Sequence, residues 1–150
     1  MQRMSTRTHG LIDYVTGMAL VALPNIMPMG KIATALFRGA GGAAAVYSAL
    51  TNYERGLYKV LPMKAHLTLD ALSGGLMLGA AAMLDDEDAE VRATMVGVGL
   101  FEIAAAVMTE TRPVPEQAGI ESSHRHGQLY QGSMQTPVEP DAQTSPVPVR

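Results

Sequence analysis

Two pairs of side chains stand out because their residue types and spacing could support chemistry. Each pair is a histidine followed four residues later by an aspartate: His9 with Asp13, and His66 with Asp70. Residues four apart share one face of a helix, so each imidazole can meet its carboxylate. Imidazole and carboxylate together suit zinc, iron or manganese, and they can also accept a proton near neutral pH.

Three hypotheses follow for these four side chains. They could bind a divalent metal ion, form a proton- or ion-coupled cluster, or only hydrogen-bond one another and anchor a helix interface. Two further ionisable residues, Arg38 and Glu102, lie within long apolar runs, and such groups usually face the interior of a helix bundle. We therefore expect one polar cluster inside the protein, made of His9, Asp13, His66, Asp70, Arg38 and Glu102. The alternative for Arg38 is that its long side chain extends to the outer membrane face.

No catalytic residue and no cofactor are predicted from the sequence. The chain lacks the P-loop, dinucleotide-binding, GxSxG and HExxH motifs. It also has no Cys, which excludes a disulfide framework, a Cys-based zinc site and a thiol nucleophile. We therefore expect a protein that is not an enzyme.

The candidate residues lie in four long apolar runs, at residues 10–26, 32–51, 66–84 and 91–108. Each run has roughly 17–20 residues, which at 1.5 Å per residue crosses a hydrocarbon core about 30 Å thick. A helix of a soluble bundle needs a charged outer stripe, but the second run offers only Arg38. We predict an all-α fold with four transmembrane helices; the alternative is a soluble bundle of Ala-rich helices.

The second half of this region repeats the first, 57 or 58 positions later. The matched pairs are His9 and His66, Asp13 and Asp70, Thr16 and Ser73, Gly17 and Gly74, and Thr51 and Thr109. We interpret the recurrence as the duplication of a helical hairpin, with copies at about 8–53 and about 65–111. The two copies then share one orientation and are related by a pseudo-twofold axis along the membrane normal.

Small residues are expected where the helices come close together, because helices in lipid associate through close packing. Gly17 and Gly74 occupy the same place in the two copies. Gly75 and Gly79 form a GxxxG pattern in the third run. We predict that these four glycines pack against neighbouring helices.

Positive charges near the ends of the runs predict the orientation in the membrane. Six of them lie on the side of the two chain ends and two on the opposite side: Arg3, Arg7, Arg55, Lys59, Lys64 and Arg112 against Lys31 and Arg92. The positive-inside rule then places both termini in the cytoplasm and the protein in the inner membrane.

Charge and composition limit the partners. A formal net charge of −3 without a basic run argues against nucleic acid. Residues 113–150 hold six of the nine prolines and lack apolar periodicity, so we predict a disordered cytoplasmic tail there. The expected partners are the lipid bilayer and either a second copy of the chain or another membrane protein.

The repeated motif resembles that of the SPW-repeat proteins, a family of small bacterial integral membrane proteins. The resemblance covers roughly residues 8–112 and rests on His9-Gly10-Leu11-Ile12-Asp13-Tyr14, Gly17, Ala22-Leu23-Pro24 and the echo at 66–74. The Ser-Pro-Trp signature is missing: Leu23-Pro24-Asn25 stands in the first copy and Met83-Leu84-Asp85 in the second. The resemblance implies a membrane location without an established activity. We therefore expect a structural or accessory component of a membrane assembly, and as the alternative a proton- or ion-coupled carrier or channel.

Overall fold

The computed structural model describes residues 3–112, and within this part the chain is helical. Its elements are α1 (Thr6–Ala22), the short 3₁₀ helix η1 (Leu23–Asn25), α2 (Lys31–Leu50), α3 (Met63–Met83) and α4 (Ala89–Met108). The predicted all-α fold with four long helices is confirmed for the described residues. The tail predicted at 113–150 lies outside them.

The helices begin and end at capping and helix-breaking residues. The side chain of Ser5 caps α1 by accepting a hydrogen bond from the Thr8 backbone N–H at 3.2 Å. Pro24 cannot continue α1, and Pro62 stands immediately before the first residue of α3. These local signals explain why each observed helix lies close to an apolar run of the sequence.

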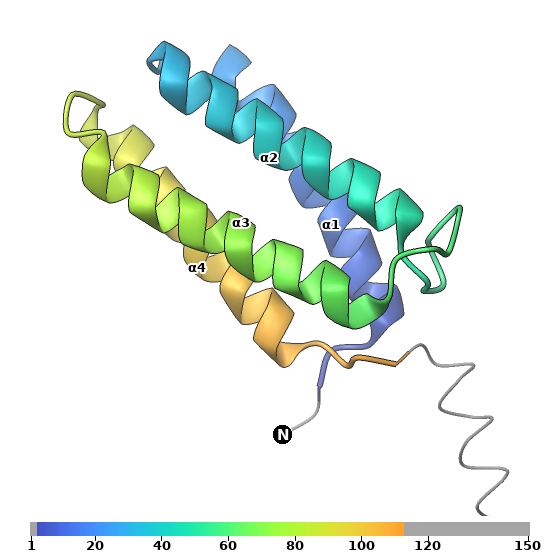
Figure 1. The fold of residues 1–150 in the computed structure, drawn as a ribbon. Helices are drawn as coiled ribbons and strands as arrows, with labels where there is room; N and C mark the ends of the chain where they lie inside the picture. Colours follow the sequence, from blue (N-terminus) through green and yellow to red (C-terminus); the bar gives the residue numbers. More distant parts are fainter. Residues whose placement is uncertain (1–2, 113–150) are drawn as a thin grey trace, which may run out of the picture. The chain divides into compact units, whose positions relative to one another are not determined.

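The helices form two antiparallel hairpins, α1 with α2 and α3 with α4 (Figure 1). The start of α1 and the α2–α3 connection lie at one end of the bundle, and the two hairpin turns lie at the other (Figure 1). The turns are tied together there, because the Gly30 backbone N–H donates to both carboxylate oxygens of Glu87, at 3.0 and 2.9 Å.

Glycines set the close contact within each hairpin. A Cβ placed on Gly17 would lie 2.9 Å from the backbone oxygen of Gly41, and one on Gly74 would lie 2.6 Å from that of Gly99. A real Cβ does not approach a carbonyl oxygen so closely, so only glycine permits these helix separations. The predicted packing role of Gly17 and Gly74 agrees with these contacts.

The other two predicted packing glycines lie elsewhere. Gly75 and Gly79 are exposed, and a Cβ on either would meet no atom within 4 Å. The prediction that they pack against a helix is therefore wrong for contacts within the described chain. The GxxxG pattern instead lines an open groove between α3 and α2, together with Ile32 and Leu36. The close contacts within the hairpins are completed by Gly41 of α2 and Gly99 of α4.

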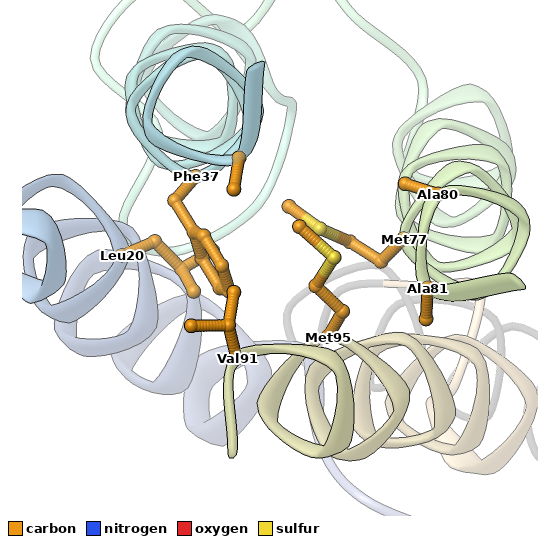
Figure 2. Close-up of a cluster of buried hydrophobic side chains, with 8 residues drawn as sticks. Leu20, Phe37, Met77, Ala80, Ala81, Val91 and Met95 are labelled. Atoms are coloured by element: carbon orange, nitrogen blue, oxygen red, sulfur yellow. The ribbon is translucent and has the colours of Figure 1, made fainter. Parts of the chain in front are cut away.

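An apolar core joins all four helices near the hairpin turns (Figure 2). Phe37, Met77 and Met95 are fully buried and point into the space among the helices, with Leu20 and Val91 beside Phe37 (Figure 2). His9 and His66 lie at the opposite end of the bundle, in the first turns of α1 and α3. The apolar core therefore fills the half of the bundle nearer the hairpin turns.

Apart from Arg38, the exposed charged residues of the helices lie in their first turns, at Arg7, Lys31, Lys64 and Glu90. Within the apolar runs of the four helices, Arg38 is the one charged residue with an exposed side chain. The exposed positions carry mainly large apolar side chains, including Leu11, Val15, Leu72 and Leu100. Among the described helices, α4 alone is long and apolar enough to cross a membrane by length and composition. By that measure four spans are not established.

Candidate functional site

The two His/Asp motifs meet at one buried point between the hairpins. One ligand atom from each of His9, Asp13, His66 and Asp70 lies within 4.8 Å of the others. His9 Nε2 lies 3.1 Å from Asp70 Oδ2, and His66 Nε2 lies 3.0 Å from Asp13 Oδ2. Each imidazole also contacts the aspartate of its own helix, at 3.3 and 3.4 Å. The four residues, called the His/Asp cluster below, therefore link the hairpins to each other.

The histidines enter the cluster from the first turns of α1 and α3. Both imidazoles are fully buried, and their Nε2 atoms are 3.2 Å apart. The two rings meet edge to face, with centroids 5.2 Å apart. Since Asp13 and Asp70 follow one helical turn later, their carboxylates reach the same point from the next layer of the bundle.

Two threonine hydroxyls decide which ring nitrogen carries the proton. Thr109 Oγ1 donates to the Ala105 carbonyl at 2.6 Å and lies 2.9 Å from His9 Nδ1. Thr51 Oγ1 has the same arrangement, with the Tyr47 carbonyl at 2.6 Å and His66 Nδ1 at 2.8 Å. A hydroxyl has one proton to donate, so each must accept from its imidazole, and Nδ1 is the protonated nitrogen. In the neutral rings, the Nε2 lone pairs therefore point into the cluster.

These threonines were not predicted as site residues, although a sequence signal was available. Thr51 and Thr109 end the second helix of each hairpin and recur at a displacement of 58 positions. Each bonds the histidine that begins the other hairpin, so the contact joins positions 51 with 66 and 9 with 109. The recurrence could have identified the two threonines as candidates. It could not show that each threonine bonds the histidine of the other hairpin.

The carboxylates have further partners on α2. Tyr47 donates its hydroxyl proton to Asp70 Oδ1 at 2.6 Å, and Ser48 donates to Asp13 Oδ2 at 3.3 Å. The buried ring of Tyr53 lies 5.7 Å from that of His66, and burial raises the pKa of its phenol well above the ordinary value. Aromatic and hydroxyl groups thus close the cluster on the α2 side.

Glu102 lies beside the cluster, as predicted. Its side chain is nearly buried, and its Oε2 has no hydrogen-bond partner among the described residues. It lines a cavity of about 20 Å³ together with His9, Asp13 and Asp70. A polar cavity of this size can hold one water molecule or ion.

Arg38 does not join the cluster, so the prediction for this residue is wrong. Its side chain is exposed, and Nη2 donates to Asn25 Oδ1 at 2.9 Å. A long flexible side chain can carry its charge along the helix towards the turn, which avoids the cost of burying it. The His/Asp cluster and the adjacent Glu102 consequently hold three carboxyl groups and no arginine.

No protein-family model, curated protein or solved structure matches this chain. The class of protein is therefore defined by its own fold and site. It is an all-α protein of two glycine-packed hairpins, joined by a buried His/Asp cluster at one end and an apolar core at the other.

Proposed function

We propose that the chain is a small integral membrane protein that acts as a non-enzymatic structural or accessory component of a membrane assembly. The observation that carries this proposal is the distribution of polarity. Within the apolar runs, no exposed helix position is charged apart from Arg38, whereas His9, His66, Asp13 and Asp70 are buried. A protein in water normally has the reverse arrangement, while polar groups in a membrane protein face the bundle interior.

The lengths of the helices support the same proposal. They contain 17, 20, 21 and 20 residues, which correspond to about 26–32 Å at 1.5 Å per residue. This matches a hydrocarbon core about 30 Å thick. Both termini then lie in the cytoplasm of an inner membrane, as the positive charges at residues 3–7 and 55–64 favour.

We also propose that the two hairpins arose by duplication. The glycine contacts Gly17–Gly41 and Gly74–Gly99 are equivalent under the displacements of 57 and 58 positions. The backbone bridges are equivalent too, since Met4 pairs with Thr109 and Leu61 pairs with Thr51. A pseudo-twofold relation between hairpins accounts for these paired contacts, and for the meeting of two copies of one motif at a single point.

A structural role suits the cluster better than ion transport. A carrier needs a polar path across the bundle, but Phe37, Met77 and Met95 fill the half nearer the hairpin turns. The polar cavity beside the cluster measures only about 20 Å³. Ion flux into proteoliposomes that vanishes on Asp70→Asn would favour the carrier and overturn the structural role.

The membrane proposal can be tested with single cysteines, because the chain has none of its own. Leu57→Cys places a thiol in the α2–α3 connection and Asp86→Cys places one in the α3–α4 turn, both at exposed positions. In intact cells an impermeant maleimide should label residue 86 only, and residue 57 should react only after permeabilisation. The cysteine-free parent is the control for background labelling.

Extraction of the membranes is the second measurement. A protein embedded in lipid stays in the membrane pellet after washing with alkaline carbonate. Recovery of the whole chain in the soluble fraction, or equal labelling of both cysteines in intact cells, contradicts the proposal.

A further inference from the structure

The His/Asp cluster has the dimensions of a tetrahedral metal site. Five of the distances between its donor atoms lie between 3.0 and 3.4 Å: one between the two Nε2 atoms and four between an Nε2 and a carboxylate oxygen. An ion bound at about 2.0–2.2 Å by four such ligands holds neighbouring donors about 3.3–3.6 Å apart. These five separations thus lie within about 0.3 Å of tetrahedral ones. Asp13 directs Oδ1 towards His9 and Oδ2 towards His66, and one ligand atom from each of the four residues lies within 4.8 Å of the others.

The orientation of the imidazoles is also that of metal ligands. Each Nδ1–H donates to a threonine hydroxyl, Thr109 for His9 and Thr51 for His66. Each Nε2 lone pair consequently faces the other Nε2 and both carboxylates. Histidines that bind metals are held in this way, with the second ring nitrogen donating to a fixed acceptor.

A cation at the centre of the His/Asp cluster would offset the repulsion among its acceptor groups. Two buried carboxylates and two inward lone pairs repel one another unless something positive lies between them. One shared proton supplies a single positive charge, and two protons would set two cationic N–H groups against each other at 3.2 Å. A divalent ion balances both carboxylates without that repulsion.

The geometry points to a divalent transition-metal site, with zinc as the best-fitting ion, formed by His9, Asp13, His66 and Asp70 and joining the two hairpins. Two imidazoles and two carboxylates in tetrahedral arrangement suit zinc. All four ligands come from the protein, which is the pattern of structural zinc sites, whereas catalytic zinc keeps one position for water. The inference deepens the proposed structural role and rests on it for the membrane setting only.

The test uses the full-length protein purified in detergent. We expect stoichiometric zinc by elemental analysis, or saturable binding of Zn²⁺ after the protein has been treated with a chelator. Replacing zinc by Co²⁺ should give the intense visible absorption of a tetrahedral site. His66→Gln should abolish both signals.

A variant that keeps all four ligands separates metal binding from folding. Thr109→Val removes the acceptor of the His9 Nδ1–H, and we expect about 10–100-fold weaker Zn²⁺ binding. Thr68→Val is the matched control: Thr68 also donates to the carbonyl four residues earlier, at 2.9 Å, but it is exposed and bonds no histidine. Its affinity for Zn²⁺ should be unchanged.

The outcomes distinguish this inference from the proposed function. If the protein remains helical and monodisperse but binds neither Zn²⁺ nor Co²⁺, the metal site is refuted while the membrane proposal stands. Equal loss of binding in the Thr109 and Thr68 variants also refutes it. If the chain binds stoichiometric metal but is recovered in the soluble fraction, the site stands and the membrane proposal fails.

Discussion

Neighbouring residues of α3 provide a test of the helix contact in which each acts as control for the other. A Cβ at Gly74 would lie 2.6 Å from the Gly99 backbone oxygen, whereas one at Gly75 would meet nothing within 4 Å. Both residues lie well inside the same helix, so replacement by Ala gains the same helix propensity, up to about 1 kcal/mol. The difference in unfolding free energy between Gly74→Ala and Gly75→Ala therefore reports the contact with α4.

The expected size of this difference follows from the geometry. Carbon normally keeps about 3.3 Å or more from a carbonyl oxygen, so α3 and α4 must separate locally by about 0.7 Å. The Cγ1 atom of Ile103, 2.9 Å from the same Cβ, must also move. Overpacking of this kind costs typically about 1–3 kcal/mol. We expect Gly74→Ala to be less stable than Gly75→Ala by that amount.

The measurement is unfolding of the detergent-solubilised variants by increasing amounts of a denaturing detergent, followed by helical circular dichroism. The first hairpin offers an independent repetition, with Gly17→Ala against Gly39→Ala, since nothing lies within 4 Å of a Cβ at Gly39. If the Gly74 variant is as stable as the Gly75 variant, the close α3–α4 approach is not what stabilises the hairpin, and the reasoning is wrong.

Three further predictions use the same unfolding assay. Tyr47→Phe should lower the unfolding free energy by about 1.5–3 kcal/mol, because it removes the 2.6 Å hydrogen bond to the Asp70 carboxylate; an unchanged stability would exclude that bond. Phe37→Ala should cost about 3 kcal/mol, the low end for a buried Phe, if the helices lie in lipid as proposed, because lipid adds no drive for burial. Phe101→Ala, at a 45 % exposed position, should cost far less; equal losses would contradict the core of Figure 2. Glu102→Gln should leave stability unchanged or increase it, since one carboxylate oxygen has no partner among the described residues; a loss above about 1 kcal/mol would mean that the carboxylate is needed.

The local features of the fold could be read from the sequence because they depend on near neighbours along the chain. Long apolar runs separated by Pro62 and by polar turns predicted four helices, and the observed bounds lie within four residues of the predicted ones, with the largest difference at both ends of α1. The four-residue spacing placed His9 with Asp13 and His66 with Asp70 on common helix faces, and the contacts at 3.3 and 3.4 Å agree.

The orientation of each helix about its own axis could not be predicted from the sequence. In a soluble bundle the apolar stripe marks the inward face, but these helices are apolar on nearly all sides. Nothing local then distinguishes Gly74, which contacts α4, from Gly75, which faces outward. The same lack of a marker explains why Arg38 was wrongly placed in the cluster.

Types and spacing in the sequence thus determined the helices and the two His/Asp motifs, since both depend on interactions within a few residues. Only the tertiary structure decided that the motifs meet, that Thr109 bonds His9 across 100 positions, and that Tyr47 reaches Asp70. These contacts arise from the packing of one hairpin on the other. Packing of that kind depends on the joint shape of all four helices, which no single stretch of the chain contains.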